Sequence, residues 1–251
     1  MTVHIALFGQ VRVLTIDRPA VRNALDNAAL RALHEALESA ADDPSVRAVV
    51  ITATGSKAFS AGLDLKALAV DGLPDPSRSP VNLLRGSFPK PVIAAVNGAA
   101  VGGGFELVLA CDLVVAAPHA VFALPEVSRG IAATEGGTDL PQRVPLPVAL
   151  EMGLTGAPIT AARAFDLGLV NALAEDALTA ALGLAGRIAA NSPIAVAATK
   201  RLMRLSLVGA DAQAANRAAN LTATAELATG PDAAEGAAAF VEKRAPRWTP
   251  A

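Results

Sequence analysis

NGAAVGGGFE, at residues 97–106, places three consecutive glycines directly before a phenylalanine and a glutamate. The preceding run PVIAAV predicts a buried strand ending at Val96, Asn97-Gly98 predicts a turn, and FELVLAC predicts a helix. The glycines therefore lie at or near a helix N-terminus, where unpaired N–H groups and the positive end of the helix dipole are exposed. An oxygen that gains negative charge in a reaction would be stabilised there, and glycine would let it approach.

The glycine run also has a structural explanation, because glycine lets a helix pack closely on a strand. Nucleotide phosphate binding explains it poorly. The motif G-x-G-x-x-G needs a glycine at position 107, which is Leu107, and G-x-x-x-x-G-K-[ST] is absent. The neighbouring motifs must decide between the remaining explanations.

SKAFSAGLDL, at residues 56–65, repeats the same arrangement. It follows the predicted strand RAVVITA and reaches Ala-Gly before a helix-like segment, so the N–H of Leu63 is expected to face outward. Two strand-to-helix junctions would then each present a backbone donor. Two donors that converge on one oxygen can hold an enolate or a tetrahedral oxyanion.

FALPEVSRGI, at residues 122–131, adds a second carboxylate, because Glu126 lies twenty positions beyond Glu106. Each glutamate follows a predicted strand, so adjacent strands could carry both to the same end of a sheet. Paired carboxylates can divide acid and base roles. The alternative is that Glu126 forms a surface ion pair with Arg129.

The composition excludes several classes of protein. The chain has 251 residues, of which 53% are hydrophobic and 18% charged, and a formal net charge of -2. Such a balance gives no broad electrostatic footprint for nucleic acid or an anionic membrane. The three histidines are scattered and Cys111 is the single cysteine, so we expect no zinc site, no intrachain disulfide, and a core position for Cys111. We see no signal peptide and predict a cytoplasmic protein.

Strands and helices alternate as far as about residue 175, which predicts an α/β fold. HIALF and VRVLTID, separated by Gly9-Gln10, predict a hairpin, and LDNAALRALHEALESAADD predicts an amphipathic helix with Asp26 or Asn27 near its N-cap. RAVVITA, PVIAAV and DLVVAA predict strands buried on both faces. Residues 66–88 predict a long loop with short helical ends.

Alanine-rich helical sequence takes over after residue 175. We predict two regions, an α/β core at 1–190 and a helical oligomerisation region at 191–251. The helices offer little bulky volume for a core of their own, so we predict a homo-oligomer. Packing only against the core of the same chain is the alternative.

These stretches together resemble the enoyl-CoA hydratase/isomerase superfamily, the crotonases. The resemblance covers nearly the whole chain and rests on RPAVRNALD, KAFSAGLDL, KPVIAAVNGAAVGGGFELVLACDLVVA, FALPEVSRGI, LTGAPITAARAFDLGLVN and FVEKRAPRW. Each motif is modest alone, whereas their order and spacing are highly specific.

The resemblance implies a crotonase-like spiral of β-β-α units with a C-terminal helical trimerisation region, assembled as a homotrimer or a dimer of trimers. It implies an acyl-CoA thioester substrate whose oxygen is held by the N–H groups of Leu63 and Gly103. Glu106 and Glu126 match the two carboxylates of a hydratase. Because CoA arrives as part of the substrate, no metal or organic cofactor is implied.

The resemblance also places a set of residues along the CoA moiety: Arg22, Asn23, Ala24, Ser60, Ala61, Gly62 and Lys243. Lys243 would meet the CoA phosphates from the C-terminal helix, although a solvated helix face explains it nearly as well. The implied activity is hydration of a trans-2-enoyl-CoA in fatty-acid or related acyl-CoA degradation. Alternatives are a Δ3-Δ2 or dienoyl-CoA isomerase and a non-catalytic acyl-CoA binding protein.

One motif departs from the family pattern. The family often has Pro-x-x-Gly-Gly after the second glutamate, whereas this chain has AATEGGTD, with Thr134 and Glu135. Some isomerases carry an aspartate where Thr134 stands. If Glu135 enters the cavity, a polar substrate or double-bond migration is implied. The chain has no tyrosine, which excludes members that recognise an aromatic substrate through a phenolic hydroxyl.

Overall fold

The computed structural model describes residues 2–72, 74–86, 88–129 and 132–207, and the single positions Glu235, Ala239, Glu242, Arg244 and Arg247. Most of the predicted oligomerisation region, including Lys243, lies outside the described residues, so the division at 190/191 stays a prediction.

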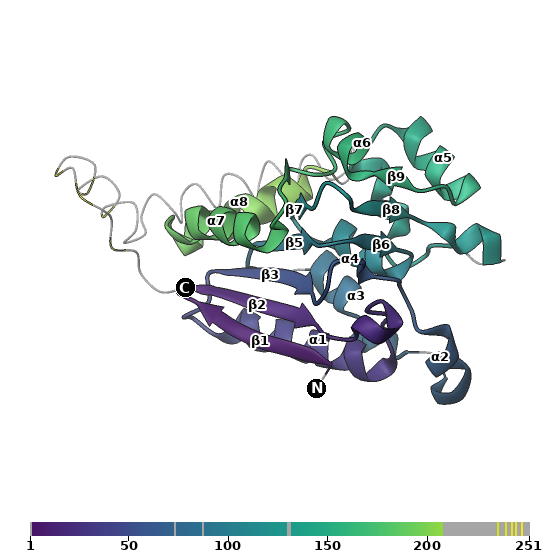
Figure 1. Cartoon of the computed structure of the whole chain (residues 1–251). Coiled ribbons are helices and arrows are strands. Elements are labelled where there is room, and N and C mark those ends of the chain that lie inside the picture. Colours follow the sequence, from purple (N-terminus) through teal and green to yellow (C-terminus); the bar gives the residue numbers. More distant parts are fainter. Residues whose placement is uncertain are drawn as a thin grey trace.

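A six-stranded sheet forms the centre of the fold (Figure 1). Its order is β1 (Val3–Phe8), β2 (Val11–Ile16), β3 (Ala48–Ala53), β5 (Val92–Val96), β7 (Leu113–Ala116) and β10 (Ala172–Leu173). β1 and β2 form the predicted antiparallel hairpin, and the other pairs are parallel. β3 and β5 are buried at every position, as their continuous apolar sequences predicted.

A second sheet of four short strands was not predicted. It consists of β4 (Ala58–Ser60), β6 (Ala99–Val101), β8 (Val121–Ala123) and β9 (Ile159–Thr160). Each turn of the chain places one strand in the large sheet and the next in the small one, as in β3-β4, β5-β6 and β7-β8. This is the spiral of β-β-α units that the family resemblance implied.

Eight α-helices are described. They are α1 (Asn27–Asp42), α2 (Leu65–Asp71), α3 (Pro80–Arg85), α4 (Gly103–Ala110), α5 (Leu146–Thr155), α6 (Ala161–Asp166), α7 (Ala177–Ala189) and α8 (Pro193–Leu205). Asp26 is the N-cap of α1, because its carboxylate accepts the Ala29 N–H at 2.8 Å. The short 3-10 helices are η1 (Pro19–Val21), η2 (Pro76–Arg78), η3 (Pro125–Arg129) and η4 (Gly137–Gln142). The predicted loop at 66–88 has the short helical ends expected of it, which are α2 and α3.

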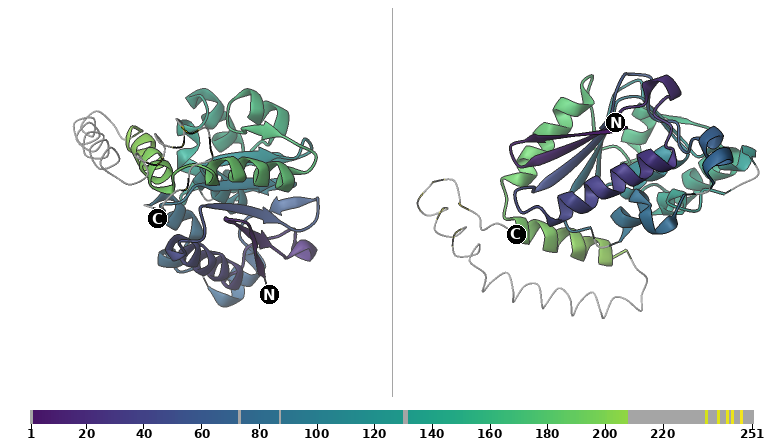
Figure 2. Two further views of the ribbon diagram at one scale, coloured as in Figure 1. Left: turned by 90° about the vertical axis from the view of Figure 1, so that its left-hand side faces the viewer. Right: turned by 90° about the horizontal axis from the view of Figure 1, so that it is seen from below.

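Helices cover both faces of the large sheet (Figure 2). On one face, α1 buries Leu30, Leu33 and Leu37 in the same core cluster as the apolar residues of α4, which confirms the predicted amphipathic helix. On the other face, α7 packs four alanines at helical spacing, Ala177, Ala181, Ala185 and Ala189, against the valines of the strands. The apolar stripe of α7, which belongs to the predicted core region 1–190, is therefore covered by the same chain.

No single described helix is long and apolar enough to cross a membrane. α7 and α8, which bend by 107° relative to each other, meet the length and composition criteria only as a pair.

Asp112 attaches α8 to the core. Its carboxylate lies 2.8 Å from Lys200 Nζ and 2.8 Å from a guanidinium nitrogen of Arg204, and it also accepts the Val92 N–H at 2.8 Å. Burial lowers the pKa of Lys200, and the carboxylate of Asp112 opposes that shift. The two cations therefore depend on this one acid.

We expect Asp112→Ala to lower the free energy of unfolding by about 3 kcal/mol, because it leaves a buried cation without its counter-charge. Urea denaturation measures this. Asp166→Ala, at an exposed position on α6, is the control and should change stability by less than about 0.5 kcal/mol. Equal unfolding midpoints for the two variants would contradict the proposed anchor.

Cys111 is fully buried at the end of α4, as predicted, and burial raises the pKa of its thiol from 9.0 to about 12. We expect no reaction with a thiol-specific chromogenic disulfide at pH 8 in the folded protein and one reactive thiol after denaturation. Because the thiol ionises more readily in the unfolded chain, stability should fall as the pH rises above about 9. Rapid labelling of the native protein would refute this placement.

Candidate active site

The turn after β4 leaves the amide of Leu63 outside the sheet. Leu63 forms an isolated parallel bridge with Leu25. The bridge uses the Gly62 carbonyl, which accepts the Leu25 N–H at 2.8 Å, and the Asp64 N–H, which donates to the Leu25 carbonyl at 2.9 Å. The N–H of Leu63 lies between these two groups and takes no part in the bridge.

The second junction confirms the predicted position of the glycine run. β6 ends at Val101, Gly102 adopts a left-handed φ of 55°, and α4 begins at Gly103. The N–H of Gly103 is one of the four amides at a helix start that have no partner within the helix. It is therefore oriented by the helix start, as the sequence indicated.

Glycines bring the two junctions into direct backbone contact. A Cβ on Gly62 would lie 2.8 Å from the Val101 carbonyl oxygen and 3.1 Å from the Gly103 nitrogen. A Cβ on Gly104 would lie only 2.4 Å from the Ser60 carbonyl oxygen. The Leu63 nitrogen is 3.7 Å from where a Cβ of Gly103 would be. The glycines are therefore required by close packing as well as by the helix start.

A buried network holds the Leu63 turn in place. Ser60 is fully buried, and its hydroxyl donates to the Asn23 carbonyl at 2.8 Å and accepts the Gly62 N–H at 3.2 Å. Asn23 has a left-handed φ of 56°, and its amide donates to the carbonyls of Thr54 and Ala58. A left-handed non-glycine residue persists only where its surroundings hold it there.

Glu106 projects from the first turn of α4 and is 7% exposed. Its Oε1 accepts the backbone N–H groups of Gly136 and Gly137, at 3.0 and 2.9 Å. Sequence reasoning missed these two donors. The signal for them was the paired glycine that follows Glu135, whose backbone can approach a carboxylate closely.

Glu126 lies in the first turn of η3, after β8, and is partly buried. Its Oε1 is 3.0 Å from where a Cβ of Gly102 would sit, so the bare backbone of Gly102 leaves room for the carboxylate. β6 and β8 are paired in parallel, and this pairing brings the two glutamates to the same end of the small sheet. The side chain of Arg129, the alternative partner, lies outside the described residues.

One cavity of about 550 Å³ joins these groups. Its lining includes Leu63, Gly103, Glu106 and Glu126, together with Ala61, Gly62, Thr134 and Glu135. The sequence therefore identified residues that the fold does bring together. Within the described residues, no three His, Cys, Asp or Glu side chains gather as metal ligands, and independence from metals stays a prediction.

The residues expected along the CoA moiety have different positions. Ala61 and Gly62 line the cavity, and the Ala61 N–H donates to the carbonyl of Arg22, an exposed residue, at 3.1 Å. Ala24 is buried, and its carbonyl accepts a hydrogen bond from Arg18. The hydroxyl of Ser60 is hydrogen-bonded inside the protein, and the contact of Ser60 with CoA stays a prediction.

Comparison with known proteins agrees with this architecture. The family model described as enoyl-CoA hydratase/isomerase matches residues 8–251, and the chain belongs to this family, within the crotonase superfamily. A carnitinyl-CoA dehydratase from Salmonella arizonae is 41% identical over 249 residues, which cover 96% of this chain and 95% of the relative.

Solved structures show the same likeness. An enoyl-CoA hydratase from Mycobacterium tuberculosis superposes with a TM-score of 0.94 at 40% identity, over 100% of this chain and 99% of its own. An enoyl-CoA hydratase from Mycobacterium marinum superposes with a TM-score of 0.93 at 41% identity, with the same coverage.

We expect Gly104→Ala to lower the free energy of unfolding by about 1–3 kcal/mol, because the added methyl would displace the Ser60 backbone. Gly183→Ala in α7, where no atom lies within 4 Å of the added Cβ, should instead stabilise by about 0.5–1 kcal/mol. Chemical denaturation of both variants measures the difference. A Gly104→Ala protein as stable as wild type would contradict the close packing of the two junctions.

Proposed function

We propose that this protein catalyses the reversible addition of water across the 2,3 double bond of a trans-2-enoyl-CoA. The observation that carries the proposal is the single cavity lined by two candidate amide donors, Leu63 and Gly103, and two carboxylates, Glu106 and Glu126. Hydration of an α,β-unsaturated thioester needs both kinds of group, because negative charge develops on the thioester oxygen while protons move at the two carbons.

In the proposed reaction the thioester oxygen lies between the N–H groups of Leu63 and Gly103. These donors stabilise the enolate, and one such donor is typically worth about a hundred- to a thousandfold in rate. Because the two donors draw electron density toward the thioester oxygen, the β carbon becomes electrophilic. The oxygen of a water molecule can then bond to that carbon.

The two glutamates divide the proton transfers. Glu106 accepts a proton from the attacking water, and the N–H groups of Gly136 and Gly137 orient its carboxylate for that purpose. Glu126 supplies the proton to the α carbon. Glu106 then carries the proton taken from water and Glu126 has lost one, and proton exchange with solvent restores both side chains. The net result is one water added, and the reverse sequence removes it. The name carnitinyl-CoA dehydratase describes the removal of water from an acyl-CoA, so that relative supports the same reaction type.

Double-bond migration is a second candidate, because Glu135 also lines the cavity and supplies a third carboxylate there. Isomerisation moves a proton between carbons and leaves the mass of the thioester unchanged. Hydration adds one oxygen and two hydrogens. Mass spectrometry of the product therefore separates the two reactions.

Trimeric assembly is part of the proposal. Exposed apolar side chains at a four-residue spacing on α5, Leu146, Leu150 and Leu154, support a protein contact on that helix.

We expect the purified protein to remove the conjugated thioester absorbance of crotonyl-CoA or of a longer trans-2-enoyl-CoA. Glu106→Gln and Glu126→Gln should each lower kcat by about a hundred- to ten-thousandfold, because each removes one proton-transfer group. Glu151→Gln, at an exposed site on α5, is the matched control and should keep the wild-type rate. Absence of turnover at every chain length by folded wild-type protein would rule out hydration, and binding without turnover would indicate a non-catalytic acyl-CoA binding protein.

A further inference from the structure

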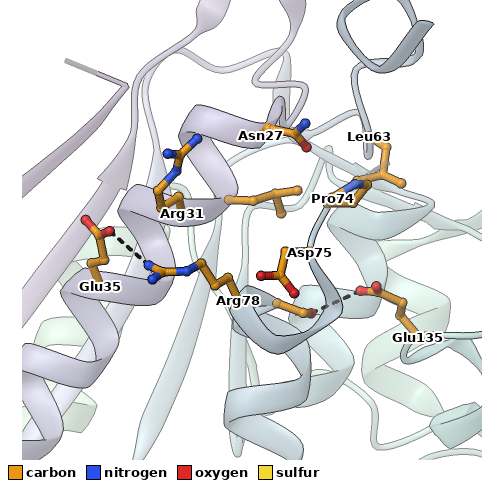
Figure 3. A pocket seen from close by; sticks show the side chains of 10 residues that line it. Asn27, Arg31, Glu35, Leu63, Pro74, Asp75, Arg78 and Glu135 are labelled. Atoms are coloured by element: carbon orange, nitrogen blue, oxygen red, sulfur yellow. Dashed lines mark hydrogen bonds and ion pairs between the residues drawn. The ribbon is translucent and has the colours of Figure 1, made fainter. Parts of the chain in front are cut away.

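A second cavity, of about 600 Å³, adjoins the catalytic one between α1 and the segment that contains η2 (Figure 3). The two cavities share four lining residues, Leu30, Leu63, Pro74 and Glu135. Three of these are apolar and the fourth is a carboxylate. An acyl chain whose reacting carbons lie beside the catalytic glutamates can therefore run past Leu30, Leu63 and Pro74 and end beside Glu135.

Glu135 is held at this junction by hydrogen bonds. Its Oε2 accepts the Ser79 hydroxyl at 3.1 Å, and its backbone carbonyl accepts a hydrogen bond from Arg85. The guanidinium of Arg85 makes its ion pair with Asp139, at 2.6 Å. Among the described residues, no cation forms a salt bridge with the Glu135 carboxylate, so its charge is available to a ligand.

Asn27, at the start of α1, also lines the second cavity. The side-chain amide of Asn27 donates to the Gly72 carbonyl at 3.2 Å, and this bond fixes which end of the side chain is the oxygen. Asn27 Oδ1 is buried and accepts no hydrogen bond from the part of the chain that the structure describes. Because protein encloses this oxygen, Glu135 is the acceptor that we assign to a ligand in the cavity.

Counted together with Glu135, the charged side chains give the cavity a formal charge of about -1. Two arginines and three carboxylates line it, and Arg78 pairs with Glu35 at 3.4 Å on the side away from Glu135 (Figure 3). A ligand that offers hydrogen-bond donors matches this lining better than an apolar chain end does. Quaternary ammonium groups are commonly held against aromatic faces, and no aromatic residue is among the described residues that line this cavity.

We propose that the second cavity is a subsite for the distal end of the acyl group, and that it selects acyl groups carrying a hydroxyl. Glu135 is the specificity-determining residue. The proposal rests on the proposed hydration of 2-enoyl-CoA. It also gives a role to Glu135, which lies in the stretch AATEGGTD that departs from the family pattern.

The test compares trans-2-enoyl-CoAs of six, eight and ten carbons with counterparts that carry a hydroxyl on the terminal carbon, using the full-length wild-type protein. We expect kcat/KM to favour the hydroxylated member of at least one pair by about tenfold or more, which is typical of a hydrogen bond to a charged acceptor. The preference should lie in KM, because the subsite is remote from the reacting carbons. Equal kcat/KM within all three pairs would overturn the proposal.

Glu135→Gln and Glu135→Ala identify the residue responsible. Both should reduce the ratio of kcat/KM between the paired substrates, and the alanine variant should bring it to about one. Glu151→Gln is the matched control and should keep the wild-type ratio. If both Glu135 variants keep the wild-type ratio of kcat/KM between the paired substrates, the assignment is wrong. That result is also expected if the CoA moiety occupies this cavity, because each variant would then change kcat/KM equally for both substrates.

Calorimetric binding of the saturated acyl-CoAs, with and without the terminal hydroxyl, separates this proposal from the proposed function. Tighter binding of the hydroxylated ligand without hydration of any enoyl-CoA would refute the function and retain the subsite. Hydration with no preference in binding or kcat/KM would refute the subsite alone.

Discussion

The fold depends on the contact between two backbone segments, the turn after β4 and the start of α4. Each segment carries a glycine where a side chain would collide with the other: Gly62 faces Val101, and Gly104 faces Ser60 at 2.4 Å from a hypothetical Cβ. Close-packed interiors do not absorb such an overlap without moving the backbone. The same contact places the amide of Leu63, in the turn, beside the amide of Gly103, at the helix start. Close packing of these two segments therefore also builds the candidate oxyanion site.

The surrounding structure keeps that contact rigid. Asn23 adopts a left-handed backbone conformation, and its side-chain amide donates hydrogen bonds to the carbonyls of Thr54 and Ala58. Its own carbonyl accepts the hydroxyl of Ser60, which links Asn23 to the Gly62 turn. Beyond the C-terminal end of α4, which is opposite to the end that carries the site, Asp112 forms ion pairs with two cations of α8. Preorganised donors need such support, because reorganising them during a reaction would forfeit their electrostatic advantage.

Much of this could be predicted from the sequence. The hairpin, α1 with Asp26, the three buried strands and the helix after the glycine run all have local signals in periodicity, caps and turns. The strands of the small sheet were missed because AFS, AAV and VFA are too short to show a period. The hydrogen bond from Gly136 to Glu106 joins residues 30 positions apart, and the bond from Ser79 to Glu135 joins residues 56 positions apart. Only the tertiary fold defines such contacts.

The proposed reaction depends on where the thioester oxygen binds. A crystal structure of the full chain with an acyl-CoA that cannot be hydrated, such as acetoacetyl-CoA, tests this position. We expect the thioester oxygen to lie within about 2.7–3.2 Å of both the Leu63 and Gly103 nitrogens, with Glu106 and Glu126 on either side of the reacting carbons. A thioester oxygen that contacts neither amide, or an acyl group bound away from the two glutamates, would contradict it.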